Sequence, residues 1–289
     1  MALPVLRHVA FALLVLPLVP PLFASDIPLV SDADEGCEGS SDTCGFGFRP
    51  EEAAAFAEVD ELEGMDEDTG NGKVALIIVD LQKDFCEPDG SLMVKGSLDI
   101  IPTINTLRSL PFFDEVFLTA DFHPIDHVSF YTQHRGKTSK DIGVTLVDLP
   151  DDMGRQVLWP PHCIAHSVGA AFHPDLKRQP TDHIILKGQR KEQTPIVGSL
   201  KASGIRSVYV MGLAMDYCVG STAVDAANYG FHTYMVEDAT AGVAKDTMDV
   251  MRNNLKEAGV TLLSSTAVQR RASWAKGKAT KPHTAASRK

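Results

Sequence analysis

The chain alternates between short, continuous apolar runs and longer segments in which apolar residues recur every three or four positions. Mainly apolar runs at residues 74–79, 116–119, 184–186, 208–211, 233–236 and 260–263 predict six strands that are buried on both faces. The spacing over residues 98–110, 216–229 and 247–258 predicts three helices, the last two of which are followed by glycine. Strands that alternate with helices predict an α/β fold: a doubly wound, mainly parallel sheet of about six strands with helices on both faces.

The same pattern divides the 289 residues into four parts. Residues 1–25 join a basic start to an apolar stretch and end in Ala24 and Ser25, as a secretory signal peptide does; an organellar leader is the alternative. The prolines and the short length of this stretch argue against a stable membrane span. Residues 26–72 form an acidic arm, residues 73–268 a body long enough for one hydrophobic core, and residues 269–289 a basic tail.

Charge is concentrated in the arm and the tail. The formal net charge is −11, and residues 31–70 alone hold 14 acidic residues and one basic residue, whereas residues 270–289 hold seven basic residues and no acidic one. Because both segments have few bulky apolar residues, we expect them to be mostly disordered. The basic residues lie in a tail and form no stripe across the body, so we expect no nucleic-acid partner.

The five cysteines are too few for a disulfide-stapled fold in a chain of this length. Cys37 and Cys44 flank a small polar loop in the arm and would pair if the chain entered an oxidising compartment. That depends on the leader: a signal peptide would send the chain to the secretory pathway or outside the cell, and otherwise the chain would be organellar or cytoplasmic. Cys86 and Cys163 are interpreted as packing residues of the body.

Four reactive side chains stand at the carboxyl ends of predicted strands. Asp80, Asp121 and Lys187 each end or follow a strand, and Cys218 lies in the first turn of the helix after the fourth strand. Taken singly, each has an ordinary explanation as a turn, core or solvated residue. Ligands of parallel sheets bind beyond the carboxyl ends of the strands, so we expect the four to meet there. A thiol at a helix N-terminus, an acid and a lysine form a complete nucleophilic set.

A metal site is also indicated. Asp121 and His123 lie two positions apart in an extended segment and therefore project to the same side. A carboxylate with imidazole suits zinc, manganese or iron. The third ligand is either His127, although Pro124 interrupts a helix that would carry it, or His162. Spacing alone leaves both candidates open.

Four segments of the body resemble one family of enzymes. Residues 79–85 (VDLQKDF), 121–130 (DFHPIDHVSF), 158–163 (LWPPHC) and 212–219 (GLAMDYCV) closely resemble the nicotinamidases, which are cysteine hydrolases of the isochorismatase-like family. The resemblance runs from about residue 73 to residue 268. The combination of DFH with WPPHC separates nicotinamidases from most relatives that use no metal.

The resemblance implies a catalytic role for each matching residue. Asp80 would be the general base, Lys187 the lysine of the triad and Cys218 the nucleophile. The backbone amides of Ala214 and Cys218 would form the oxyanion hole, with a cis peptide between Leu213 and Ala214.

The resemblance also implies how ligands are bound. It assigns the metal to Asp121, His123 and His162, which decides against His127. The ion would be divalent, zinc first, with Mn²⁺ or Fe²⁺ as alternatives. The aromatic walls of the substrate pocket would be Phe85, Trp159 and Tyr217.

The implied activity is hydrolysis of nicotinamide to nicotinate and ammonia through a Cys218 thioester, a step of NAD salvage, in a monomer or a homo-oligomer. One departure stands out. Nicotinamidases usually carry a longer segment with a Tyr-Ser-x-Phe sequence after the lysine and glycine, whereas residues 188–200 are short in this chain. The short segment keeps two alternatives open: a catalytically impaired binding module of the same fold, and a related amidase with another small amide as substrate.

Overall fold

The computed structural model describes residues 72–149, 154–189 and 196–279. The predicted leader, the acidic arm with Cys37 and Cys44, and the end of the basic tail lie outside these residues. In the part of the chain that is described, no helix is both long and apolar enough to cross a lipid bilayer.

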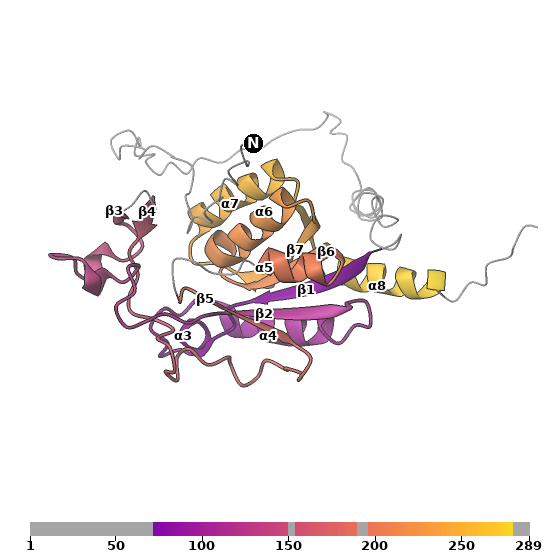
Figure 1. Ribbon diagram of the computed structural model, residues 1–289, viewed down its shortest axis with the longest axis horizontal. Helices are drawn as coiled ribbons and strands as arrows, with labels where there is room; N and C mark the ends of the chain where they lie inside the picture. The colour runs from indigo at the N-terminus through magenta and orange to yellow at the C-terminus, as the bar shows by residue number, and fades with distance from the viewer. Residues whose placement is uncertain (1–71, 150–153, 190–195, 280–289) are drawn as a thin grey trace, which may run out of the picture.

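A six-stranded parallel sheet forms the centre of the fold (Figure 1). Its strands are β1 (Lys73–Val79), β2 (Glu115–Asp121), β5 (His183–Lys187), β6 (Ile205–Leu213), β7 (His232–Ala241) and β8 (Thr261–Leu263). They lie in the order β5-β2-β1-β6-β7-β8, and every neighbouring pair is parallel. All six predicted strands and the doubly wound fold are therefore confirmed.

The strand order reverses between β1 and β6. The chain runs outward from β1 through β2 to β5, then returns to place β6 on the other side of β1 and runs outward again to β8. Such a switch point opens a crevice at the carboxyl ends of the two central strands, where ligands of doubly wound folds bind. Asp80 follows β1, and Cys218 follows β6 after five residues.

Helices cover both faces of the sheet, which explains the continuous apolar runs of its strands (Figure 1). Leu76 and Ile78 of β1 pack in one buried cluster with α4 (Ser97–Leu107) and α8 (Ser265–Ala279). Ala75 and Ile77 of β1 face the other way, into a cluster with α5 (Ile196–Ala202), α6 (Gly220–Asn228) and α7 (Lys245–Glu257).

Two helix predictions need correction. The helix expected over residues 216–229 begins as a π-helical turn, η3 (Met215–Val219), before α6. The expectation of a disordered tail from residue 269 onward is wrong for its first part, because α8 continues to Ala279. Alanine, arginine and lysine are strong helix formers. The side chain of Arg271 is also buried, with its guanidinium 4.5 Å from the ring centre of Tyr234, so tertiary packing holds the helix.

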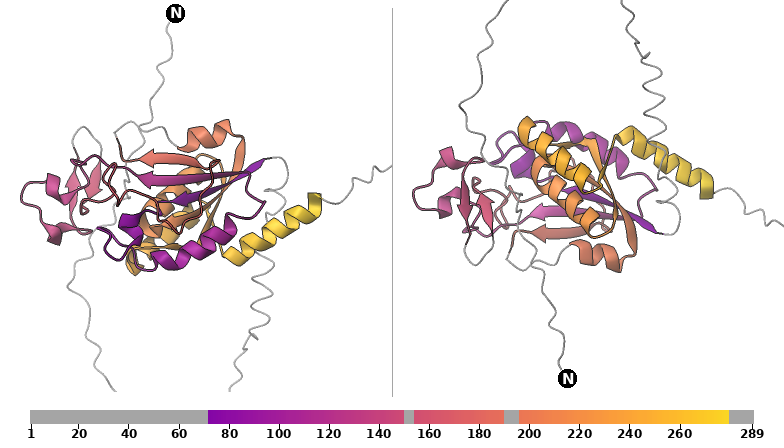
Figure 2. Two further views of the ribbon diagram at one scale, coloured as in Figure 1. Left: turned by 90° about the horizontal axis from the view of Figure 1, so that it is seen from below. Right: turned by 90° about the horizontal axis from the view of Figure 1, so that it is seen from above.

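Several segments between β1 and β5, for which no helix or strand was predicted, surround the crevice. They hold the short helix α3 (Lys83–Cys86), the 3₁₀ turns η1 (Tyr131–Gln133) and η2 (Ser139–Asp141), and an antiparallel pair, β3 (Leu146–Asp148) with β4 (Arg155–Val157). The part with β3 and β4 projects beyond the carboxyl ends of the parallel strands (Figure 2).

Candidate active site

The four side chains expected at the carboxyl edge of the sheet lie together. The Lys187 ammonium at the end of β5 is 2.7 Å from Asp80 Oδ2 and 3.4 Å from Cys218 Sγ, and it is paired with Asp121 as well. One carboxylate oxygen of each aspartate and the Cys218 sulfur lie within 4.8 Å of one another. The Lys187 ammonium is thus surrounded by two carboxylates and a thiol.

Asp80 is held in an uncommon backbone conformation. Its φ is +52°, in the left-handed region that residues other than glycine rarely adopt, and its side chain is fully buried. The Thr119 hydroxyl donates a hydrogen bond of 2.7 Å to Asp80 Oδ1, which leaves Oδ2 to Lys187. The sharp turn after β1 therefore aims the carboxylate at the crevice, and such outliers gather at functional sites.

The charges set the resting proton positions. Burial raises the pKa of the Asp80 carboxyl above its ordinary value, although Lys187 opposes that shift. Burial likewise raises the pKa of the Cys218 thiol well above its ordinary value, with Lys187 again opposing. Burial would lower the pKa of Lys187, but Asp121 and Asp80 outweigh it and keep the ammonium charged. The thiol is accordingly protonated at rest and needs a base, and the carboxylate beside it has a raised proton affinity.

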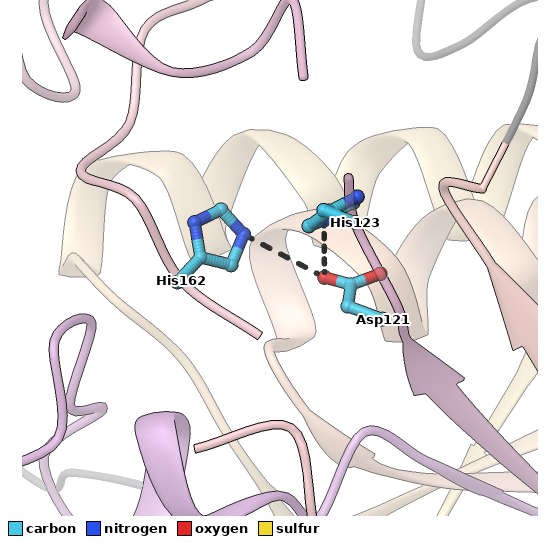
Figure 3. A group of neighbouring side chains, drawn as sticks. All are labelled: Asp121, His123 and His162. Carbon is cyan, nitrogen blue, oxygen red and sulfur yellow. Dashed lines mark ion pairs between the residues drawn. The ribbon is translucent and has the colours of Figure 1, made fainter. Parts of the chain in front are cut away.

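Asp121, His123 and His162 form a second cluster beside the first (Figure 3). All three are buried, and their ligand atoms lie within 4.8 Å of one another. Nε2 of His123 is 3.4 Å and Nε2 of His162 is 3.7 Å from Asp121 Oδ2. Burial would raise the pKa of Asp121, but the Lys187 ammonium outweighs burial and holds that pKa well below its ordinary value, so the carboxylate is an anion.

The two histidines are oriented by main-chain carbonyls. Nδ1 of His123 is 3.0 Å from the Gly188 oxygen, and Nδ1 of His162 is 2.7 Å from the Pro160 oxygen. A carbonyl only accepts, so each Nδ1 carries the hydrogen and each Nε2 keeps a lone pair that faces Asp121. One carboxylate oxygen and two such imidazole nitrogens are a donor set that fits a divalent metal and leaves positions open for another ligand.

His127 does not join this cluster. Its ring stacks on that of His123 with centroids 4.1 Å apart, while Nδ1 lies 2.7 Å from the Ser129 hydroxyl. Burial, with a contribution from His123, lowers the pKa of His127 to about 4. Of the two candidates that spacing left open, the structure brings His162 next to Asp121 and His123.

Aromatic side chains line the same region. Trp159 and Tyr217 meet edge to face with ring centroids 4.9 Å apart, and Phe85 lies with its ring centroid 5.5 Å from that of His162. The peptide between Leu213 and Ala214 is cis, as expected. Residues 190–195 of the short segment lie outside the described residues, but Lys187 precedes them and takes its place in the cluster.

Three residues around these clusters were not predicted from the sequence. Gln82 and Asp84 make hydrogen bonds to the main chain beside Asp121, His123 and His162, which we call the histidine cluster. Asp216 accepts hydrogen bonds from the start of α7 and the loop before it. Gln82 and Asp84 stand in the VDLQKDF segment, and Asp216 stands two residues before Cys218. Their proximity in sequence to Asp80 and Cys218 was the available signal, but their partners are distant in sequence.

Comparison with known proteins agrees with this geometry. Residues 74–267 match the Isochorismatase domain family. The nicotinamidase of Acinetobacter baylyi is 38% identical over 205 residues, which cover 66% of this chain and 89% of that enzyme. PnC1 of L. infantum, solved in complex with nicotinate, is 35% identical with a TM-score of 0.58 and covers 69% of this chain and 95% of its own.

A third relative was solved with a metal. The pyrazinamidase of Pyrococcus horikoshii in complex with zinc is 28% identical with a TM-score of 0.54, covering 66% of this chain and 99% of its own. The family match spans most of the described residues, and the nicotinamidase of A. baylyi aligns over nearly its full length. The chain therefore belongs to the isochorismatase-like family, among its nicotinamidases.

Proposed function

We propose that this protein is a nicotinamidase, a metal-dependent cysteine amidase that converts nicotinamide and water to nicotinate and ammonia. One observation carries the proposal: the Cys218–Lys187–Asp80 set lies directly beside the Asp121–His123–His162 set. The two sets are joined by the ion pair between Lys187 and Asp121. The similarity to nicotinamidases over the whole body supports it. Release of nicotinate is consistent with a role in NAD salvage.

Asp80 and Cys218 carry the first half of the reaction. Asp80 removes the proton of the Cys218 thiol, and the sulfur attacks the carboxamide carbon of the substrate. The negative charge that develops on the amide oxygen is stabilised by the backbone N–H groups of Ala214 and Cys218. Asp80 then gives its proton to the nitrogen, the carbon–nitrogen bond breaks, and ammonia leaves behind a thioester on Cys218.

Water completes the reaction. Asp80 takes a proton from a water molecule, whose oxygen attacks the thioester carbon. The carbon–sulfur bond breaks, nicotinate is released and the proton returns to Cys218. Lys187 contacts Asp80 at 2.7 Å, and its positive charge opposes the effect of burial on the Asp80 pKa.

The remaining residues bind and orient the ring. We assign Asp121, His123 and His162 to a divalent metal, for which zinc is the leading candidate because of the donor set and the zinc complex of a relative. When bound, the ion supplies a Lewis acid for the ring nitrogen of nicotinamide. Phe85, Trp159 and Tyr217 would enclose the ring between aromatic faces.

A substrate comparison tests the proposal. Nicotinamide and benzamide have the same carboxamide, but benzamide has no ring nitrogen for the metal. We expect the purified protein to release nicotinate and ammonia in equal amounts from nicotinamide, and to act far less on benzamide. Equal rates on both would favour an amidase of broader substrate range. Metal bound in full with no hydrolysis of any small amide would favour the binding module.

Paired histidine variants test the ligand assignment. We expect His162→Ala to lose bound metal and affinity for nicotinamide together, because its Nε2 faces Asp121. His127→Ala should retain the metal, because His127 points its Nδ1 to Ser129. Metal lost with His127 and kept without His162 would refute the assignment. Metal content per chain after dialysis is the readout.

A further inference from the structure

The turn after β1 holds a buried amide side chain whose polar atoms all bind main chain. Gln82 is fully buried, and its Nε2 donates to the Asp121 oxygen at 2.7 Å and to the Ala170 oxygen at 2.9 Å. Its Oε1 accepts from the Asp121 N–H at 2.7 Å. The side chain therefore grips both main-chain polar groups of Asp121, as a neighbouring strand would. Only a carboxamide supplies two donors and an acceptor in this arrangement.

Asp84, two residues later, binds the loop that carries His162. Its Oδ2 accepts from the Cys163 N–H at 2.7 Å, in the peptide that joins Cys163 to His162. Cys163 has a φ of +45°, so this contact stabilises an uncommon backbone conformation directly after His162. The Cys163 oxygen in turn accepts from the His123 N–H at 3.0 Å.

These contacts connect all three members of the histidine cluster to one short segment. Asp121 is held by Gln82, and the main chains of His123 and His162 meet at Cys163, which is held by Asp84. Asp121 is the last residue of β2, whereas His162 lies on a loop much later in the sequence. The distance between Asp121 and His162 therefore depends on contacts that bind both parts of the chain. Residues 80–84, which include Asp80, provide these contacts through Gln82 and Asp84.

We propose that Gln82 and Asp84 are positioning residues that fix the spacing of Asp121, His123 and His162 for the metal. This inference rests on the proposed function in that those three residues are taken as the metal ligands. Both side chains bind main-chain groups and supply none of the three ligand atoms. Outer hydrogen-bond partners of metal ligands contribute about 10- to 100-fold in metal affinity or activity.

Two substitutions test the proposal in the full chain. Gln82→Met keeps the length and shape of the side chain and removes all three hydrogen bonds. Asp84→Ala removes both carboxylate oxygens, and with them the acceptors of the Cys163 and Ser91 N–H groups. We expect the dissociation constant for Zn²⁺, measured by competition with a chromophoric chelator, to rise about 10- to 100-fold in both variants.

The chain offers matched controls far from the site. The Asn105 amide donates to the Asp175 oxygen at 2.7 Å and accepts from the Lys177 N–H at 2.8 Å, so Asn105→Leu removes a comparable amide clamp. Asp114 Oδ2 accepts from the Val74 N–H at 2.8 Å, so Asp114→Ala removes a comparable carboxylate contact. Both controls should bind Zn²⁺ as the wild type does, even if they lose thermal stability.

Further measurements separate positioning from a general structural role. The rate at which iodoacetamide alkylates Cys218 in metal-free protein should match the wild type, because the triad stays in place. Turnover should recover as the Zn²⁺ concentration is raised, because a site of lower affinity is still filled at a higher concentration of the ion. If Gln82→Met does not fold, Asp84→Ala decides, because Asp84 is half-buried and its truncation adds no atoms to the core.

The outcomes are distinguishable. Wild-type protein that binds Zn²⁺ and hydrolyses nicotinamide, with both variants at wild-type Zn²⁺ affinity, would overturn this inference and leave the proposed function standing. Equal weakening in the Asn105 and Asp114 controls would also overturn it, because any loosening of the fold would then have the same effect. Wild-type protein that binds no Zn²⁺ would overturn the metal assignment and this inference together.

Discussion

Removal of the Lys187 ammonium would leave two buried carboxylates and a thiol without their cation. Lys187 contacts Asp80, Asp121 and Cys218, and Asp80 is fully buried. Loss of one partner from a buried ion pair costs about 3–5 kcal/mol, because the remaining charge is unpaired. For a body of this size, each kcal/mol lowers the melting temperature by about 2–4 °C. Lys187→Met should therefore melt about 6–20 °C below the wild type near neutral pH.

The sign of the pH dependence follows from Asp80. Its pKa in the folded protein is raised above the ordinary 3.8 by burial, and loss of Lys187 raises that pKa further. A carboxyl whose folded pKa is raised contributes stability below pH 3.8, where it is protonated in both states, and loses that stability as pH rises through the folded pKa. The stability deficit of Lys187→Met should therefore be smallest in acid and grow toward neutral pH.

Thermal denaturation across pH, together with ammonia release from nicotinamide, measures both effects. Lys95→Met is the control, because Lys95 is exposed on a loop. We expect the control to match the wild type and Lys187→Met to lose about 100- to 1,000-fold in turnover, since an ionised base needs its cation. A variant that melts with the wild type at every pH and keeps its turnover would refute the reasoning.

Three further substitutions or reagents test other parts of the site. Gly188→Ala should lose bound metal on dialysis, because Gly188 has a φ of +71° and an added Cβ would overlap the imidazole of His123; wild-type metal content would count against that contact. Iodoacetamide should label Cys218 before Cys86 in native protein, because Cys218 is half-buried whereas Cys86 is only 1% exposed; peptide mass spectrometry gives the order, and faster labelling of Cys86 would contradict this. Asp216→Asn should destabilise the fold by about 1–3 kcal/mol in chemical denaturation, because its carboxylate accepts from two N–H groups and a hydroxyl at the start of α7, and an unchanged midpoint would contradict this.

The parallel sheet was predictable because each strand is buried on both faces and so appears as a continuous apolar run. The rule that ligands bind at the carboxyl ends of parallel strands then groups Asp80, Asp121, Lys187 and Cys218 from their sequence positions alone. His162 was not predictable from spacing, since it arrives on a loop whose path depends on main-chain contacts such as that between Asp84 and Cys163. Resemblance to a family supplied what periodicity lacked.

Other features were hidden for the same reason. Gln82 looks like a turn residue in the sequence, and its partners at residues 121 and 170 are 39 and 88 positions away. The first part of the tail has few bulky apolar residues, which indicates disorder, but its alanine, arginine and lysine residues are strong helix formers. The burial of Arg271 over Tyr234 is a long-range contact that no local pattern shows.

The central claim, that Cys218 is the nucleophile of a nicotinamide amidase, is tested most directly by one comparison. Ammonia release from nicotinamide is measured for the wild type, for Cys218→Ala and for Cys86→Ala, each with its metal content determined. Cys86 is a free thiol that is buried in the core, and it serves as the matched control. We predict that Cys218→Ala binds metal but releases no ammonia above the buffer rate, whereas Cys86→Ala retains turnover. Ammonia release by Cys218→Ala at the wild-type rate would contradict the claim.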